Sequence, residues 1–147
     1  MGNRRQAREM ALQALYLNDT CGFSSKMALE TISSELASNQ EIGSQENERT
    51  GKSLITEFCE HLVNGVFSKK DEIDAILARY TENWDIKRMA TVDRNILRLS
   101  TFEIITDLGT PISVIIDEAI EIAKNFSTED SGKFVNGILD KVKQERK

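Results

Sequence analysis

Hydrophobic residues recur every three or four positions along most of the chain, which is the spacing of one face of an α-helix. Near the N-terminus this spacing predicts a helix over residues 4–18. Its apolar face is formed by Ala7, Met10, Ala11, Ala14 and Leu15. Ser25 is expected to cap a shorter helix over about 26–38. The polar stretch 38–53 has little pattern and predicts a long surface loop.

The apolar spacing is strongest in the middle of the chain, where it predicts a helix over 54–68. Another helix is expected to begin at Ser68 or Asp71. Thr91 is expected to cap a helix over 92–107. Because that helix is apolar on more than one face, it should lie at the centre of the fold.

Two more helices are predicted towards the C-terminus. Gly109 is expected to end the preceding helix, and Pro111 to open the next one, over 111–125. A last helix is expected over about 129–143. No segment alternates convincingly with period two, so the sequence predicts an all-α fold of about seven helices without an internal repeat.

The composition agrees with this fold class. One proline and eight glycines among 147 residues supply too few turns for an all-β sandwich or barrel. No apolar run exceeds four residues, so no membrane span is expected. The N-terminal MGNRRQARE has no apolar stretch behind it, so we expect no secretory signal and a cytoplasmic protein. Cys21 and Cys59 form no CxxC pair and are expected to be reduced and unpaired.

Charge is distributed unevenly, although the net charge of −5 by itself argues against binding to nucleic acid. Residues 1–16 contain three arginines and one glutamate, and residues 140–147 contain four basic and two acidic side chains. Two basic ends on an acidic body suggest an anionic partner at those ends. Basic termini that only increase solubility explain the charge distribution equally well.

The sequence contains no clear catalytic or metal-binding motif. Gly51-Lys52-Ser53 lacks the earlier glycine and the strand of a phosphate-binding loop, and is expected to be a loop that ends in a helix cap. His61 is the single histidine, so its spacing from Glu57 predicts a partly exposed helix residue rather than a metal ligand. One histidine also offers no supported nucleophile–base pair. We therefore expect neither an enzyme nor a bound cofactor or metal.

Three arginines on the first predicted helix form the strongest candidate site. At about 100° per residue, Arg4, Arg5 and Arg8 fall within one narrow arc beside the apolar face. Arginine offers a planar fork of donors to phosphate oxygens and stacks on exposed bases. Tyr16, further along the helix, could stack on a base, although a position in the core is the better interpretation.

The start of the last predicted helix is a second candidate site. Backbone N–H groups at a helix start favour an anion, and Lys133 adds positive charge beside Phe134. Asp130 is expected to be the N-cap of this helix.

Three long segments together carry a family resemblance. They are RRQAREMALQALY, WDIKRMATVDRNILRLSTFEI and PISVIIDEAIEIAKNFSTEDSGKFVNGILDKV. In this order and spacing they closely resemble the NusB family of bacterial transcription antitermination factors. The resemblance spans most of the chain, with residues 19–53 as the exception.

This resemblance implies an all-α fold of two three-helix subdomains, roughly 1–80 and 81–147, packed around the helices 92–107 and 111–125. It implies binding of single-stranded boxA RNA as a heterodimer with NusE, a small-subunit ribosomal protein. The complex would join RNA polymerase and suppress premature termination in ribosomal RNA operons. The resemblance implies no catalysis and no cofactor.

The residues that match the family's RNA-binding positions lie in two groups. Arg4, Arg5 and Arg8 match its arginine-rich motif, and Asp130, Lys133 and Phe134 match the end of its RNA face. Tyr16 joins them as the candidate stacking residue.

Other residues that match the family motifs are expected to be structural. Trp84 is expected to close the junction of the subdomains, and Asp93 is expected to pair with Arg94. Gly137 interrupts the last helix, where close packing against another backbone is expected.

Three other functions are alternatives to RNA-dependent antitermination. The same fold occurs as the RNA-binding module of ribosomal RNA cytosine methyltransferases, but this chain has no room for the enzyme. A helical protein–protein scaffold without an RNA role would have no need of the three arginines aligned on the first predicted helix. An enzyme would need a catalytic pair, a metal cluster or a cofactor loop.

Overall fold

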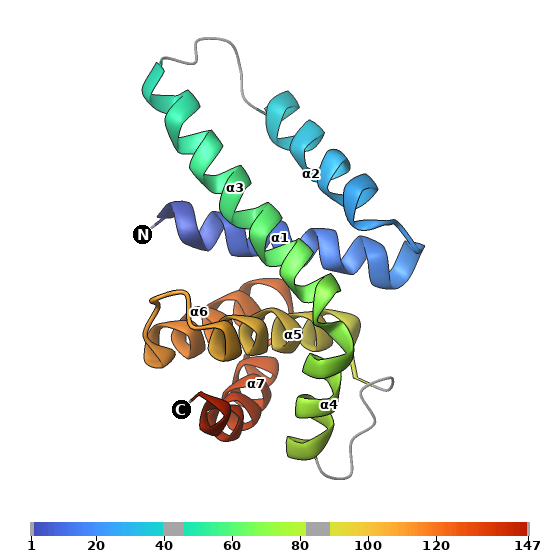
Figure 1. The fold of residues 1–147 in the computed structure, drawn as a ribbon, viewed down its shortest axis with the longest axis vertical. Coiled ribbons are helices and arrows are strands. Elements are labelled where there is room, and N and C mark those ends of the chain that lie inside the picture. Colours follow the sequence, from blue (N-terminus) through green and yellow to red (C-terminus); the bar gives the residue numbers. More distant parts are fainter. Residues whose placement is uncertain (1, 40–45, 82–88, 147) are drawn as a thin grey trace. The chain divides into compact units, whose positions relative to one another are not determined.

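The structure is a computed structural model that describes residues 2–39, 46–81 and 89–146. Within these ranges the side chains of residues 2, 3, 35–39 and 46–53 are not described. The described residues contain seven α-helices and no strand, which confirms the all-α prediction (Figure 1). Trp84 lies outside the described residues, so its expected role stays a prediction.

The seven helices follow one another with short connections wherever the chain is described. They are α1 (Gly2–Cys21), α2 (Ser25–Asn39), α3 (Glu46–Ser68), α4 (Lys70–Tyr80), α5 (Thr91–Thr106), α6 (Ile112–Phe126) and α7 (Glu129–Val142). A short 3-10 turn, η2 (Lys143–Glu145), follows α7.

The chain divides into two compact units, Met1–Asn64 and Gly65–Lys147. The first unit holds α1, α2 and most of α3, and the second holds the end of α3 together with α4 to α7. The division therefore lies earlier than the boundary expected near residue 80, and α4 belongs to the second unit.

The first unit is built on the predicted apolar face of α1. All five residues of that face are buried, and α1 contacts α2. Ala28 and Ile32 of α2 and Cys59 and Leu62 of α3 are also buried. Burial of this face holds α1 in place along its length, so Arg4 and Arg5 near its N-terminus are carried by an anchored helix.

Helix α5 is the centre of the second unit, as the sequence predicts. It contacts α4, α6, α7 and η2, and its residues from Asn95 to Ile104 are all buried. The buried Arg98 donates from Nε and Nη2 to the two carboxylate oxygens of Asp74 on α4, at 2.9 and 3.0 Å. A two-point ion pair of this kind fixes the direction of both side chains as well as their charge.

Gly65 at the end of α3 packs directly against the Phe102 ring of α5. A Cβ atom at this position would overlap three ring carbons of Phe102, whose side chain is buried. Gly137 has nothing within 4 Å of the corresponding position, so the prediction of close backbone packing there is wrong. Gly132 of α7 lies close to Lys124 and Ile120 of α6 instead.

Three of the predicted helix caps are wrong by one or two residues. The Oγ of Ser24, rather than Ser25, accepts from the N–H of Met27 at 3.1 Å. Ala90 occupies the N-cap position of α5, where no side chain caps the helix, and Thr91 is the first helical residue. Thr128, rather than Asp130, caps α7.

The polar stretch after residue 45 is helical rather than a loop. Helix α3 begins at Glu46, eight residues before its first apolar position, so the loop predicted over 38–53 is wrong at both ends. Gly51-Lys52-Ser53 lies inside this helix, and its N–H groups cannot form the open turn of a phosphate-binding loop. Helix α4 begins at Lys70, at neither predicted start, and Lys69 offers no side-chain cap.

The connection between α5 and α6 is a left-handed turn. Asp107 and Gly109 have φ angles of 46° and 87°, and the Gly109 N–H donates to Asp107 Oδ1 at 3.3 Å. Pro111 then occupies the N-cap position of α6, whose bounds differ by one residue from the prediction.

Candidate nucleic-acid interface

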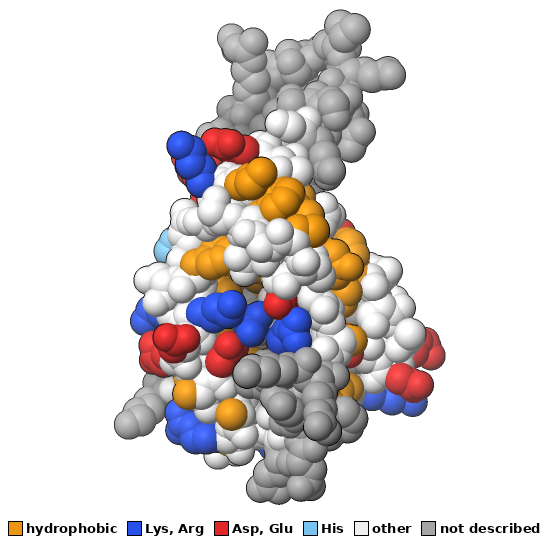
Figure 2. Space-filling model, turned by 90° about the vertical axis from the view of Figure 1, so that its right-hand side faces the viewer, with side chains coloured by type: hydrophobic (Ala, Val, Ile, Leu, Met, Phe, Trp, Pro, Cys, Tyr) orange, Lys and Arg blue, Asp and Glu red, His pale blue; other side chains and the backbone are white. Residues whose placement is uncertain are grey.

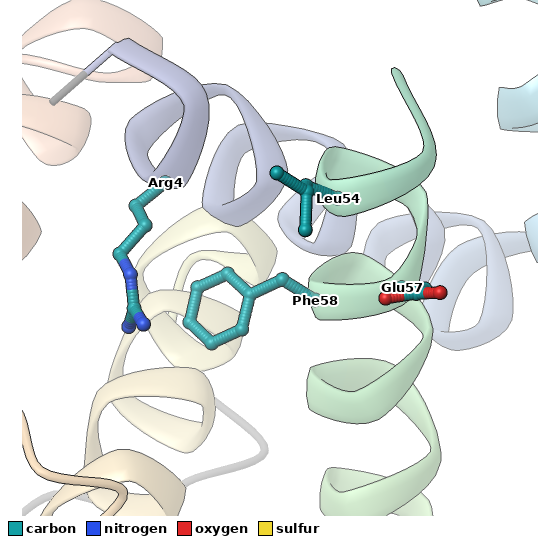
Figure 3. A pocket seen from close by; sticks show the side chains of 4 residues that line it. All are labelled: Arg4, Leu54, Glu57 and Phe58. Atoms are coloured by element: carbon teal, nitrogen blue, oxygen red, sulfur yellow. The ribbon is translucent and has the colours of Figure 1, made fainter. Parts of the chain in front are cut away.

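Two of the three arginines on α1 lie over the ring of Phe58, a residue of α3. The guanidinium carbons of Arg4 and Arg8 are 4.7 and 5.6 Å from the ring centroid. Both distances are within the range of a cation–π interaction. Arg4 and Arg8 are four residues apart, so they occupy one face of α1, and Phe58 belongs to the same unit. Figure 3 shows the Arg4 side chain beside the Phe58 ring.

The three arginines differ in exposure. Arg4 is exposed and Arg5 is half-buried, whereas Arg8 is only 4% exposed. The predicted group of three arginines therefore presents Arg4 and Arg5 at the surface, with Arg8 packed beneath them.

A pocket of about 500 Å³ opens beside the Arg4–Phe58 pair. Its described lining residues are Arg4, Leu54, Glu57 and Phe58 (Figure 3). Leu54 is 55% exposed, so it gives the pocket an apolar wall that is open to solvent. Phe58 is half-buried, and sequence reasoning missed its place beside the arginines because it fits the apolar spacing of α3.

Tyr16 lies at the surface and not in the core. Its side chain is 42% exposed, so the preferred prediction of a core position is wrong. An exposed tyrosine ring on the same helix as the arginines suits stacking on a base.

The second group of predicted residues occupies the first turns of α7. Asp130 and Lys133 are exposed, and Phe134 is half-buried. The Oγ1 of Thr128 accepts from the Ser131 N–H at 3.1 Å, so the helix start is already capped without Asp130. The structure thus places Asp130 and Lys133 at the surface of one helix start in the second unit.

A partly buried hydrogen-bond cluster lies beneath this helix start. Ser131 Oγ lies 2.8 Å from Ser127 Oγ and donates to Asp93 Oδ2 at 3.3 Å. The other oxygen of Asp93 is buried without a hydrogen-bond partner. Burial raises the pKa of Asp93, and the Ser131 bond offsets part of that rise. Asp93 therefore pairs with Ser131, and the prediction of a charge pair with Arg94 is wrong.

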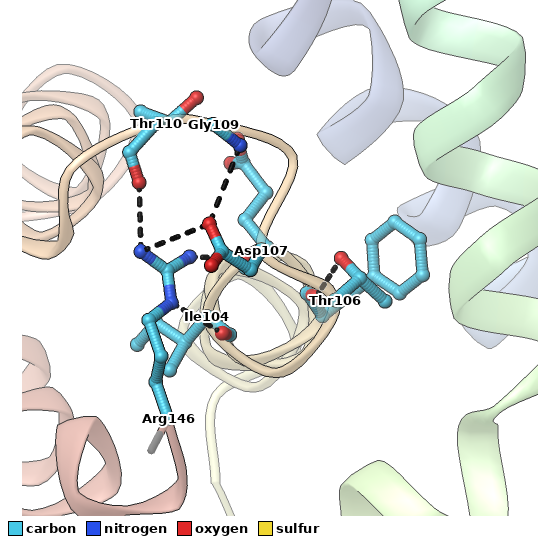
Figure 4. Close-up of polar contacts among 8 residues, drawn as sticks. Ile104, Thr106, Asp107, Gly109, Thr110 and Arg146 are labelled. Carbon is cyan, nitrogen blue, oxygen red and sulfur yellow. Dashed lines mark hydrogen bonds and ion pairs between the residues drawn. The ribbon is translucent and has the colours of Figure 1, made fainter.

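The basic C-terminal end makes contacts within the chain. Arg146 donates to the backbone carbonyls of Glu103, Ile104 and Thr110, each at 2.8 Å, and lies 3.6 Å from Asp107 (Figure 4). Lys143 pairs with Asp140 at 2.8 Å. These contacts satisfy carbonyls at the end of α5, so they explain part of the basic charge without an anionic partner.

Basic and acidic side chains are interspersed on the face of the molecule in Figure 2, with apolar side chains among them. This face is not covered by charge of a single sign. Such a surface agrees with the net charge of −5 and favours local arginine contacts over a broad basic surface.

The other side chains considered for chemistry are His61 and the two cysteines. His61 is exposed on α3, and no group of three metal-ligating side chains occurs among the described residues. Cys21 and Cys59 are both free, as predicted. Burial and the neighbouring Glu60 raise the pKa of Cys59 to about 12, so its thiol is a poor nucleophile. No described helix is long and apolar enough to cross a bilayer.

A sequence profile of the NusB family matches residues 5–144. The chain belongs to the NusB family. It is 41% identical to the transcription antitermination protein NusB of Elusimicrobium minutum, over 100% of this chain and 97% of the relative. It is 44% identical to the NusB of Geotalea daltonii, over 97% and 94% of the two chains. The predicted family is therefore confirmed along the whole length, including residues 19–53.

The fold also matches solved NusB structures. One is a crystal structure of the antitermination factors NusB and NusE in complex with double-stranded RNA. The matched chain there has a TM-score of 0.80 and 26% identity, and the match covers 98% of both chains. The all-α class and the NusB-like arrangement are thus confirmed.

Proposed function

We propose that this chain is an RNA-binding transcription antitermination factor. It binds boxA RNA as a heterodimer with NusE and helps RNA polymerase read through terminators in ribosomal RNA operons. The proposal includes a cytoplasmic location, because transcription takes place there in bacteria. The observation that carries the proposal is the match over nearly the full chain to a fold solved together with NusE and RNA.

The exposure of each residue determines its proposed role in RNA binding. Arg4 and Arg5 reach the surface and contact phosphates, because a guanidinium offers donors in a fork that matches phosphate oxygens. Arg8, which is buried, holds the Phe58 ring and contributes positive charge from below. Tyr16 stacks on a base.

The start of α7 supplies the second part of the surface. Lys133 contacts a phosphate, and Phe134 adds a partly exposed ring for a base. Asp130 is an acid among these groups, so it repels nearby phosphate rather than attracting it. Replacing Asp130 by Asn should therefore leave RNA affinity equal or raise it, which titration of both proteins with boxA RNA would show. A weaker Asn variant with unchanged stability would instead indicate that the carboxylate accepts from a base amine.

Salt dependence tests the arginine contacts. The log of RNA affinity should fall linearly with the log of salt concentration, with a slope of about −0.7 per phosphate neutralised on a single strand. An Arg4→Ala/Arg5→Ala variant should bind RNA more weakly. Its salt slope should be less steep by about one to two times 0.7, because one or two phosphate contacts are lost. Arg8 is left intact because its removal would disturb packing. A slope identical to that of the unaltered protein would exclude these arginines as phosphate contacts.

NusE should raise the affinity for boxA well above that of either protein alone. The first helix carries only three arginines, which leaves a small footprint for RNA without a partner. Co-purification with NusE followed by a gel-shift titration with boxA RNA measures both interactions. Equal RNA affinity with and without saturating NusE would contradict the heterodimer, and a chain that captures NusE but never RNA would be a protein scaffold.

A further inference from the structure

The pocket beside Phe58 has a chemistry that phosphate contacts do not explain. Arg4 forms one side, and α3 supplies Leu54, Glu57 and Phe58 (Figure 3). A volume of about 500 Å³ is enough for a small planar ligand. An aromatic ring and a leucine would be a poor setting for a strongly hydrated phosphate, and the Glu57 carboxylate would repel one.

A nucleobase fits each of these groups. The Arg4 guanidinium lies over the Phe58 ring, and a base can extend such a stack because bases stack on both aromatic rings and guanidinium planes. Leu54 offers apolar contact to the base edge. Glu57 can only accept hydrogen bonds when ionised, so it favours a base with an exocyclic amine.

We propose that the pocket of Arg4, Leu54, Glu57 and Phe58 is a nucleobase subsite that prefers amine-bearing bases over uracil. This inference rests on the proposed function, because it assumes that the chain binds RNA. The neighbouring Arg5 on α1 is a proposed phosphate contact, so a nucleotide held there places its own or an adjacent base beside the pocket. A protein segment could also fill the pocket, but nothing links such a segment to the neighbouring arginines. Binding of a protein segment is therefore one outcome that the test distinguishes.

Substitution of Phe58 tests the stacking. Phe58→Leu keeps an apolar side chain but removes the ring, and should weaken binding of a boxA RNA oligonucleotide about tenfold, within the range measured for loss of base stacking. The salt slope should not change, because no phosphate contact is lost. Phe58→Tyr keeps an aromatic ring and should bind more tightly than Phe58→Leu. Met27→Ala, which removes another exposed apolar side chain of the same unit, is the matched control and should have no effect.

Substitution of Glu57 tests the base preference without altering the core, since this side chain is exposed. Single replacements of amine-bearing bases by uracil along the oligonucleotide should reveal one position with a penalty of about tenfold. In Glu57→Gln the penalty at that position should largely disappear, because an amide can also donate to a uracil carbonyl. Other positions should respond equally in both proteins.

The outcomes separate this inference from the proposed function. If Phe58→Leu and Glu57→Gln bind and discriminate like the unaltered protein while Arg4→Ala/Arg5→Ala flattens the salt slope, RNA binding stands and the subsite is wrong. If Phe58→Leu loses NusE but keeps RNA affinity, the pocket holds a protein segment and the inference is overturned. If the unaltered chain binds no RNA, both proposals fall. Thermal unfolding of each variant shows whether a loss of RNA binding is caused by misfolding. If Phe58→Leu does not fold, the Glu57→Gln variant decides between the outcomes, because Glu57 is exposed and its replacement leaves the core intact.

Discussion

Arginine is used in different ways in the two units of this chain. In the first unit, Arg4 and Arg8 lie over the face of an aromatic ring. In the second unit, Arg98 and Arg146 are held by directed hydrogen bonds to a carboxylate and to backbone carbonyls. The ring contact of Arg4 and Arg8 has little directionality, whereas Arg98 and Arg146 are fixed by hydrogen bonds to particular oxygens. The same type of side chain thus packs on a ring in one unit and ties helices together in the other.

The largest expected effect is a loss of folding stability when an arginine of the second unit is replaced. Arg98→Met should remove the ion pair to Asp74 and leave that carboxylate half-buried without its partner. Loss of a buried ion-pair partner costs about 3–5 kcal/mol, and the partial exposure of Asp74 should bring the loss here to about 2–3 kcal/mol. Urea unfolding measures the loss, and RNA affinity below the unfolding range should not change. Weaker RNA binding by a folded Arg98→Met protein would contradict a purely structural role for Arg98.

The cap of α7 gives the next effect and separates two neighbouring residues. Thr128→Ala should cost about 0.5–2 kcal/mol, because the Ser131 N–H loses its acceptor. Asp130→Ala should cost less, about 0.3–1 kcal/mol, since Asp130 only adds negative charge near the positive end of the helix. Melting temperatures of the two variants check the order. A larger loss for Asp130→Ala would mean that the carboxylate caps the helix in solution.

A smaller effect should distinguish the two arginines over Phe58. Arg8→Met should lose about 0.5–1 kcal/mol of stability, because a buried cation–π contact is removed while the apolar stem is kept. Arg4→Met should leave the melting temperature nearly unchanged but reduce RNA affinity. Equal stability losses in the two variants would show that exposure does not separate their roles.

The last effect is a pH dependence in the cluster beneath α7. Because the pKa of Asp93 is raised by burial, the folded state binds its proton more tightly than the unfolded state does. Stability should therefore fall as pH rises from the ordinary value of 3.8 through the raised folded pKa. Asp93→Asn removes this titration, so its stability relative to the unaltered protein should increase with pH across that window. A constant difference between the two, measured by urea unfolding from pH 4 to 7, would contradict the assignment.

The helices were predictable because apolar spacing is a property of the local sequence. Helix α6 carries apolar residues around a wide face, and its predicted and observed bounds differ by one residue at each end. The early start of α3 was not predictable from apolar spacing. Its first eight residues are polar, and an established helix extends through such residues at little cost because nucleation has already occurred further along.

The caps show a different limit. Several polar residues at the start of α7 are of types that can cap a helix. The residues that precede or open this helix are Ser127, Thr128, Glu129 and Asp130. The choice falls to Thr128, whose extended backbone places its oxygen at the Ser131 N–H. Backbone geometry of this kind depends on how α6 ends and α7 packs, so sequence alone could not select the residue.

The site was predicted in its residue types and not in its geometry. The arginines were found because charge and helical spacing are readable from sequence, but the burial of Arg8 and the exposure of Tyr16 depend on neighbours distant in the chain. Phe58 was overlooked for the same reason. Its spacing is that of a core residue, and only the fold shows that its ring meets two guanidinium groups.

The contact between Gly65 and Phe102 carries a consequence for the history of this sequence. Gly65 begins the second unit inside a continuous helix, and the Phe102 ring occupies the space that a methyl group would need. Neither residue can be enlarged without reducing the other, so the two positions are bound to evolve together. Relatives that carry a larger residue at the first position should carry a smaller one at the second. Such paired substitutions would be visible as covariation between two sites 37 residues apart.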